Sequence, residues 1–218
     1  LTFGSTVGDF DKDGDLDLVV TISNGNIGLL LGKGNGNFDP PVTFATGEQP
    51  YTAITGDWNK DGNPDVAVAG STTDNVAIHL GNGNGNFAPA VFYPAGGGTI
   101  GIVSGDFNED GNPDLAATNF SDGKVSIFLG NGNGTFGNAM NFPIGNIPYT
   151  VVAGDFDHDG HLDLAPNNRG SSSIAVILGN GNGTFGALTT FSVGVEPYSV
   201  LVGDWNSDGN LDLASIHY

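Results

Sequence analysis

Short segments in which hydrophobic and polar residues alternate run along the whole chain, separated by turns rich in Gly, Asn and Asp. They are clearest between residues 51 and 93, where we expect strands at 51–56, 65–69, 75–80 and 87–93. Alternation with a period of two is typical of β-strands, and no segment shows a helical period over a convincing length. The pattern therefore predicts an all-β fold.

This four-strand pattern repeats along the chain. An acidic loop recurs with starts at Asp9, Asp57, Asp106, Asp155 and Asp204, which are 48, 49, 49 and 49 residues apart. We therefore divide the single domain 1–218 into repeats 1–48, 49–97, 98–146 and 147–195 and a partial repeat 196–218. Four-stranded units of this period are typical of a β-propeller, in which each unit forms one blade around an axis.

About four and a half repeats do not complete a ring of blades. Two interpretations remain open: an incomplete ring, or an open or assembled array in which neighbouring chains cover the exposed strand edges. The second residue of each acidic loop is aromatic, and we expect it to pack between blades because aromatic side chains supply large buried contact areas. These residues are Phe10, Trp58, Phe107, Phe156 and Trp205.

Each acidic loop is nine residues long, and we number its positions 1 to 9. Positions 1, 3, 5 and 9 hold only Asp or Asn, position 6 is always Gly, and position 7 varies. Side-chain oxygens at positions 1, 3, 5 and 9, with the backbone carbonyl at position 7, are the expected ligands of a cation. Loop by loop, the predicted ligands are Asp9, Asp11, Asp13, Asp15 and Asp17; Asp57, Asn59, Asp61, Asn63 and Asp65; Asp106, Asn108, Asp110, Asn112 and Asp114; Asp155, Asp157, Asp159, His161 and Asp163; and Asp204, Asn206, Asp208, Asn210 and Asp212.

The donor set points to calcium, which takes six to eight oxygen ligands in flexible geometry. A glycine at position 6 is expected where the backbone must turn with positive φ around an ion. An EF-hand is excluded, because position 12 lacks Glu and the residues that follow alternate like a strand. The alternative is a set of Asp/Asn/Gly turns without an ion, but the fivefold recurrence favours Ca2+, about one ion per loop and up to five.

Charge supports a cation-binding protein. The chain has 24 acidic and 5 basic residues and a formal net charge of -19, and nineteen of the acidic residues lie in the acidic loops. No basic patch exists for nucleic acid, no apolar run is long enough to span a membrane, and no cysteine is present. We expect structural calcium in place of disulfides, and a secreted, extracellular or cell-surface location where calcium is millimolar.

The repeats look like the FG-GAP (VCBS-type) repeats of integrin α-subunit propellers and of related bacterial and fungal proteins. The Asp-x-Asp/Asn-x-Asp-Gly-x-x-Asp loop inside a repeat of this length carries the resemblance, which covers essentially the whole chain. It implies that the loop joins two strands of a blade and holds calcium at the edge of the propeller. It also implies adhesion, carbohydrate binding or scaffolding, without selecting one of them.

We predict an adhesion or scaffolding module whose partner is a protein or glycan at the cell surface, or identical chains. One alternative is a lectin with sites between blades, for which Tyr51, Tyr149 and Tyr198 are candidate aromatic residues. Another is a building block of an extracellular fibre or surface assembly. Enzymatic activity is not expected, because no catalytic constellation occurs once in the chain, and His158 and His161 are expected to be solvated loop residues.

Overall fold

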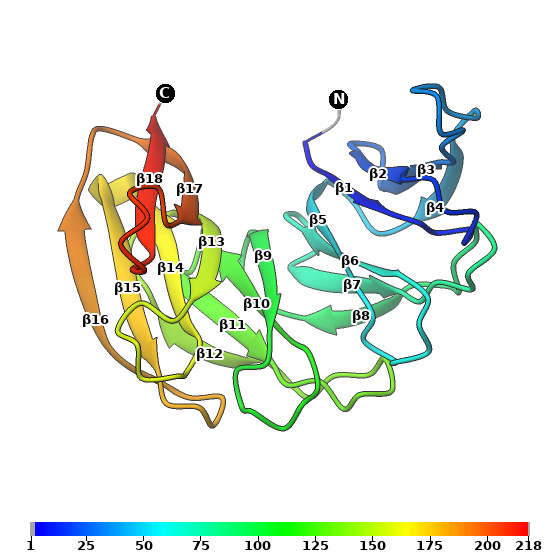
Figure 1. The fold of residues 1–218 in the computed structure, drawn as a ribbon. Helices are drawn as coiled ribbons and strands as arrows, with labels where there is room; N and C mark the ends of the chain where they lie inside the picture. The colour runs from blue at the N-terminus through cyan, green and yellow to red at the C-terminus, as the bar shows by residue number, and fades with distance from the viewer. Residues whose placement is uncertain (1–2, 218) are drawn as a thin grey trace.

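The structure is a computed structural model that describes residues 3–217, and it is built from antiparallel sheets (Figure 1). Four sheets have four strands each, and a fifth has two. The strands are β1 (Ser5–Gly8), β2 (Asp17–Ile22), β3 (Asn26–Leu30) and β4 (Val42–Ala45); β5 (Pro50–Gly56), β6 (Asp65–Gly70), β7 (Asn75–His79) and β8 (Val91–Pro94); β9 (Thr99–Gly105), β10 (Asp114–Asn119), β11 (Lys124–Phe128) and β12 (Met140–Pro143); β13 (Pro148–Gly154), β14 (Asp163–Asn168), β15 (Ser173–Gly179) and β16 (Phe185–Ser192); and β17 (Pro197–Gly203) and β18 (Asp212–His217).

The prediction of an all-β fold with four-stranded blades is confirmed. A single 3-10 turn, η1 (Arg169–Ser171), joins β14 to β15. Between residues 3 and 217, no helix has the length and apolar character needed to cross a bilayer. The predicted strand 87–93 is shorter in the structure, where Phe87 makes only an isolated bridge with Gly81 and β8 begins at Val91. Pro89 lies in the gap, and a proline has no N–H to donate to a strand ladder.

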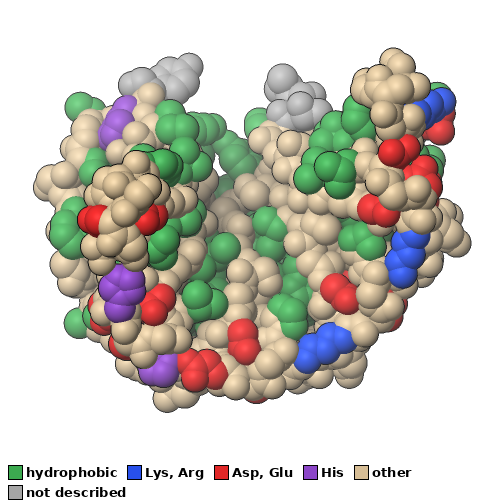
Figure 2. Space-filling view, in the orientation of Figure 1, with side chains coloured by type: hydrophobic (Ala, Val, Ile, Leu, Met, Phe, Trp, Pro, Cys, Tyr) green, Lys and Arg blue, Asp and Glu red, His purple; other side chains and the backbone are tan. Residues whose placement is uncertain are grey.

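The five sheets, which we call blades 1 to 5, follow one another around a common axis without closing into a ring (Figure 1). The first strand of each blade lies beside the first strand of the next, in the order β1, β5, β9, β13 and β17. Blades 1 and 5 stand on opposite sides of a gap, and Figure 2 shows the surface hollowed between them.

The hydrophobic core lies between blades rather than within one sheet. One cluster, for example, joins Trp58 and Ile78 of blade 2 to Leu115 and Phe128 of blade 3. Because neighbouring blades cover both of its faces, every residue of the second strand is buried in blades 2, 3 and 4. In β2 of blade 1, buried and half-buried residues alternate instead. Burial of each blade therefore depends on its neighbours.

Three of the five loop aromatics are buried between blades, as predicted, whereas Phe156 is half-buried. Phe10, Trp58 and Phe107 are each 2 % exposed. Each packs edge-on against a phenylalanine of the next blade, with ring centroids 5.4 Å apart for Phe10–Phe87, 6.5 Å for Trp58–Phe136 and 5.9 Å for Phe107–Phe185. Trp205, in the two-stranded blade 5, is 56 % exposed. Whether the blades belong to an incomplete ring or an assembled array stays a prediction.

A backbone hydrogen bond accompanies each aromatic pair. The Asn-Gly turn between the third and fourth strands of one blade donates an N–H to the loop aromatic's carbonyl in the blade before it. The three bonds are Gly85 to Phe10 at 3.0 Å, Gly134 to Trp58 at 2.9 Å and Gly183 to Phe107 at 2.8 Å. The repeated Gly-rich turn thus joins neighbouring blades as well as two strands.

His79 is a polar residue in this otherwise apolar layer. It occupies the place that Leu30, Phe128 and Ile177 hold in the other complete blades, and it lies against Phe87. The side chain is buried, and neither ring nitrogen has a hydrogen-bond partner among the described residues. Burial lowers the pKa of His79 to about 4, because the imidazolium form would lose its hydration.

Replacing this side chain by phenylalanine should therefore make the protein less sensitive to acid. As the pH falls below about 6.5, the unfolded chain binds a proton at His79 before the folded protein does. Stability should then fall until the pH reaches the folded pKa of about 4. Between pH 7 and pH 5, the parent should lose about 2 kcal/mol of unfolding free energy through His79, and His79→Phe should not lose this amount.

The measurement is urea unfolding of both proteins at pH 7 and pH 5, at one fixed calcium concentration. Comparing two variants cancels the titration of the other groups. Equal losses of stability in the two proteins would show that His79 is not buried in its neutral form.

Candidate metal centres

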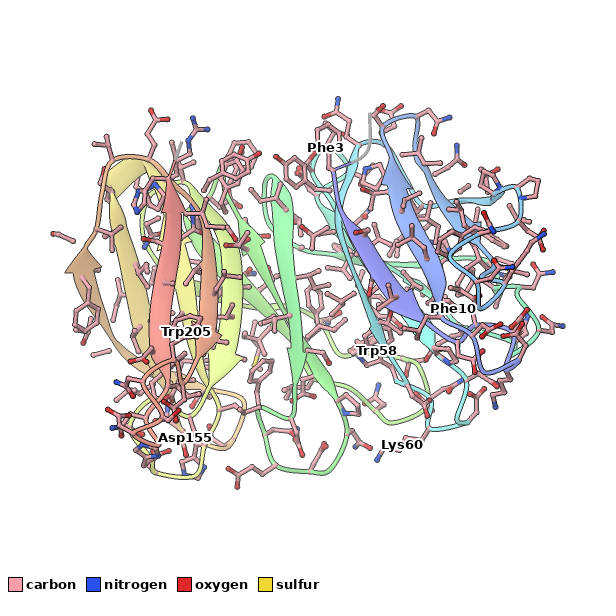
Figure 3. The ribbon with its side chains drawn as sticks, turned by 45° about the horizontal axis from the view of Figure 1, so that its top comes forward. Phe3, Phe10, Trp58, Lys60, Asp155 and Trp205 are labelled. Carbon is pink, nitrogen blue, oxygen red and sulfur yellow. The ribbon has the colours of Figure 1, made fainter. Side chains whose placement is uncertain are left out.

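The five acidic loops connect the first strand of each blade to the second, and they lie at the end of the blades opposite Phe3. Figure 3 labels Asp155 and Lys60 in these loops, and Figure 2 shows acidic side chains distributed along the same rim. In every loop the backbone is left-handed at position 6, with φ between 80° and 93° at Gly14, Gly62, Gly111, Gly160 and Gly209. Glycine tolerates this conformation because it has no Cβ.

Position 4 is also left-handed, although it is never glycine. Its φ lies between 57° and 62° at Lys12, Lys60, Glu109, His158 and Ser207. Residues with a side chain rarely adopt this conformation, so its recurrence in all five loops marks a constraint shared by the loops. This conformation could not be predicted from the sequence, because the residue types at position 4 have little in common.

Backbone N–H groups hold the carboxylates of positions 1 and 5 in the same arrangement in every loop. In loop 1, one oxygen of Asp9 accepts from the N–H of Asp13 at 3.1 Å and the other from Gly14 at 3.1 Å. Asp13 in turn accepts from the N–H of Asp15 at 2.8 Å. The corresponding bonds recur in the other four loops, with the last one at 2.8 Å in each. These hydrogen bonds curl the loop tightly around the carboxylates of positions 1 and 5.

The side chain of position 3 is held on the same side of the loop backbone as those of positions 1 and 5. The side-chain oxygens of Asp11, Asn59, Asn108, Asp157 and Asn206 all accept from the N–H of position 5, at 2.9 to 3.2 Å. Where position 3 is Asn, its amide also donates to the position-5 carboxylate, as from Asn59 to Asp61 at 2.9 Å. The backbone N–H of position 7 lowers the pKa of Asp61, Asp110 and Asp208, which keeps these carboxylates ionised.

Position 9 differs from the other ligand positions because it is buried in loops 1 to 4. One oxygen of Asp65 accepts from the N–H of Trp58 at 2.9 Å, and the other accepts from the N–H of Gly81 at 2.8 Å. Asp17, Asp114 and Asp163 make the same pair of bonds. Burial raises the pKa of Asp65 and of Asp114 to about 6, and it raises that of Asp163. A nearby cation would favour the ionised form of these groups.

The donor set fits a hard cation. In loop 1, carboxylate oxygens of Asp9, Asp11 and Asp17 lie within 4.8 Å of one another. In loop 4, the same is true of Asp155, Asp157 and Asp159. Position 9 retains acceptor capacity beyond its two N–H partners, because a carboxylate has about four lone-pair sites. Each loop therefore gathers oxygens of the kind that calcium prefers.

At position 7, asparagine side chains bond to position 5 of their own loop: Asn210 Nδ2 donates to Asp208 Oδ1 at 2.9 Å. Side-chain hydrogen bonds from Asn63 and Asn112 likewise help to lower the pKa of Asp61 and Asp110.

Position 7 also reaches the neighbouring loop. Asn112 accepts a hydrogen bond from Lys60 Nζ of the preceding loop at 2.7 Å. The rings of His158 and His161 make exposed contacts with Asn210 and Glu109, each in a neighbouring loop, and the sequence did not predict these pairings. The hydrogen bond with Glu109 raises the pKa of His161. A backbone role for position 7 in metal binding remains a prediction.

The three tyrosines proposed for a lectin lie together near the axis. The hydroxyls of Tyr51 and Tyr198 are hydrogen-bonded at 3.0 Å, although they come from blades 2 and 5. Tyr149 contacts both, with ring centroids 6.1 Å from Tyr51 and 5.0 Å from Tyr198. Burial and the bond to Tyr198 raise the pKa of Tyr51. The tyrosines thus form one cluster across the axis instead of separate clefts.

Grooves between blades are lined by other residues. A groove of about 490 Å³ between blades 1 and 2 is lined by Phe44, Phe87 and Phe92, with His79 at its base. The equivalent groove between blades 2 and 3, of about 280 Å³, is lined by Tyr93, Phe128 and Asn141 among others. Recurrence of the same groove follows from the repeated packing of the outer strands.

A family model described as FG-GAP-like repeat matches residues 9–68, 57–117, 106–165 and 167–215. No curated protein sequence matches the chain. Three solved structures are similar over nearly the whole chain. A protein from Lactobacillus plantarum has a TM-score of 0.69 and 16 % identity, covering 98 % of this chain and 64 % of its own. Streptogramin B lyase has a TM-score of 0.67 and 18 % identity, with coverage of 98 % and 62 %.

The third structure is an Agrocybe aegerita lectin that specifically recognises non-reducing terminal N-acetylglucosamine. Its TM-score is 0.64 and its identity 21 %, with coverage of 99 % of this chain and 60 % of the lectin chain. This chain therefore spans about 60 % of the length of the solved structures that it matches. At these identities the likeness shows the fold alone.

One prediction from the sequence is contradicted by these comparisons. We expected no enzymatic activity, but streptogramin B lyase is an enzyme with the same fold. We had reasoned that catalytic residues should occur once in the chain, whereas the acidic residues recur in every repeat. A fold built from repeats can nevertheless carry a single site with residues of its own. The likeness assigns no reaction to this chain.

Removing the buried charge at position 9 should destabilise the protein. In Asp114→Asn, an amide with one acceptor oxygen must replace two charge-assisted bonds, from the N–H of Phe107 and of Gly130. We expect a loss of about 2 to 3 kcal/mol in unfolding free energy, measured by urea unfolding at fixed calcium. Asp212→Asn is the matched control, because Asp212 is only half-buried and is bonded to the N–H of Trp205. Equal losses in the two variants would contradict a structural role for the buried pair of bonds.

Proposed function

Because the chain belongs to the FG-GAP-like repeat family, we propose that it is an extracellular calcium-binding scaffold whose ions stabilise the blades. One observation carries the proposal: all five loops share one backbone conformation and one hydrogen-bond scheme that directs the oxygens of positions 1, 3 and 5 inward. The side chains of positions 1, 3, 5 and 9 would hold the ion, together with the carbonyl of position 7.

Charge explains why an ion would stabilise the fold. The acidic loops carry nineteen of the 24 acidic residues, and five divalent ions would bring the formal charge from -19 to -9. Without a cation, carboxylates within 4.8 Å of one another repel. The ion would supply opposite charge to these groups and oppose the separation of the strands that each loop connects.

We expect calcium to raise the melting temperature and excess chelator to lower it. If the calcium concentration were about tenfold above the Kd of each of five independent sites, binding would add about 7 kcal/mol to the unfolding free energy. The measurement is thermal unfolding with calcium, magnesium or chelator, combined with calorimetric titration of the calcium stoichiometry. A melting temperature that does not respond to calcium would overturn the proposal.

The matched variants are Asp106→Ala and Glu48→Ala. Asp106 is position 1 of loop 3, and its loss should lower the stoichiometry from about five ions to about four. Glu48 is an exposed acidic residue outside the loops, and its loss should leave the stoichiometry unchanged. A fall in both variants would indicate general charge attraction in place of defined sites.

For the partner, we propose a protein or glycan at the cell surface. A rigid arc of blades with metal-stabilised loops at one end suits adhesion or scaffolding, because it presents loops and grooves at fixed spacing. Sugar recognition is the second candidate, and it is supported by the recurrent aromatic grooves between blades. The lectin with the same fold adds an analogy to that support.

A glycan array with terminal N-acetylglucosamine among its sugars tests this second candidate. Phe92 lines the groove between blades 1 and 2 and is 47 % exposed. We expect Phe92→Ala to weaken binding about tenfold through loss of an aromatic contact, whereas Tyr198→Ala at the axis should not. No binding by the parent protein would dismiss the candidate, and a loss confined to Tyr198→Ala would relocate the site to the axis.

A further inference from the structure

The acidic loops are joined to one another by side chains at two fixed positions. Position 4 of one loop contacts position 7 of the next at three successive junctions. Lys60 Nζ donates to Asn112 Oδ1 at 2.7 Å, His161 Nδ1 pairs with Glu109 Oε1, and His158 Nε2 lies 2.9 Å from Asn210 Oδ1. The separation in sequence is 52 residues each time.

The remaining junction, between loops 1 and 2, uses the same position 4. The charge of Lys12 contributes to the lowered pKa of Asp61 in loop 2, after the larger effects of the local hydrogen bonds. A Cβ placed on Gly62 would lie 4.0 Å from the Lys12 ammonium. Lys12 therefore reaches from loop 1 to loop 2.

Backbone conformation accounts for the reach of position 4. Its left-handed φ recurs in all five loops and is unusual for residues with side chains. Such a conformation persists only when the surrounding structure imposes it. Position 7 is held within its own loop, because its N–H donates to position 5. An asparagine there can bond to both loops: the amide of Asn210 donates to Asp208 of its own loop, while its side-chain oxygen bonds to position 4 of the loop before.

The chemistry of the paired positions matches at each junction where both side chains bond. Where position 7 is Asn, position 4 is a donor, Lys60 or His158. Where position 7 is His161, position 4 is the acceptor Glu109. The bridges are therefore complementary pairs and not chance contacts of long side chains.

We propose that position 4 of loops 2, 3 and 4 is a positioning residue for the metal site of the loop that follows. The position-4 side chain holds the side chain of position 7, and so fixes the residue whose carbonyl would face the ion. Neighbouring metal sites are thereby linked in a row. This inference rests on the proposed function, that the acidic loops bind calcium. Groups that orient first ligands commonly alter metal affinity by tenfold or more.

The two tryptophans make single loops observable. The chain has two, Trp58 at position 2 of loop 2 and Trp205 at position 2 of loop 5. Terbium replaces calcium at oxygen sites and luminesces when a nearby tryptophan is excited. In Trp58→Phe, Trp205 alone reports loop 5, and in Trp205→Phe, Trp58 alone reports loop 2. Phenylalanine is the natural residue at this position in the other loops.

The test is terbium titration, followed by displacement with calcium, in the full chain. In the Trp58→Phe background, His158→Ala should weaken the affinity of loop 5 about tenfold. His158→Lys should restore it, because Lys60 makes the same bond to Asn112. Ser207→Ala, at position 4 of loop 5 itself, is the matched control and should leave the affinity unchanged. In the Trp205→Phe background, His158→Ala should not change loop 2.

The outcomes separate the two proposals. No terbium signal in the parent backgrounds would overturn calcium binding itself. Binding that His158→Ala leaves unchanged would overturn the linkage alone. Loss of affinity in His158→Ala that His158→Lys fails to restore would show a general disturbance of loop 4 and would also overturn the linkage. Circular dichroism of each variant confirms that the comparison is made between folded proteins.

Discussion

The buried carboxylate at position 9 of acidic loops 1 to 4 is the interaction on which the rest of each four-stranded blade depends. Asp65 begins a strand, accepts an N–H from the start of its own loop, and accepts a second from Gly81 at the end of the third strand. One side chain thus ties three separate segments together. A charged group in this position is unfavourable unless it is fully hydrogen-bonded, so the fold must supply both donors with good geometry.

Packing between blades is the second level of organisation, and it depends on the first. The loop that Asp65 holds carries Trp58, which is buried only because Phe136 and Gly134 of the next blade cover it. The hydrophobic clusters accordingly span pairs of blades. A blade in isolation would expose the apolar residues that its neighbours cover, which is why stability in repeat proteins resides in interfaces as much as in the repeats.

The sequence was sufficient for the fold class because two periods are superimposed in it: alternation within strands and recurrence of the loop every 48 or 49 residues. The burial of Phe10, Trp58 and Phe107 also followed from their fixed place in that loop. Contacts between loops could not be predicted, because Lys60 and Asn112 are 52 residues apart and neither residue type is unusual at a surface. The gathering of Tyr51, Tyr149 and Tyr198 depends on the curvature of the arc, which alternation within strands does not encode.

The paired side chains between loops have a consequence for how such an array can evolve. The apolar layers are nearly identical from one junction to the next, so gain or loss of a whole repeat would preserve the core. The polar bridges are not all interchangeable, because the pair of Glu109 and His161 has its acceptor at position 4. Deleting the third repeat would bring Lys60 opposite His161, replacing two matched pairs with two basic side chains and removing the carboxylate that His161 pairs with. The order of repeats is therefore constrained at the rim even where the interior would accept recombination.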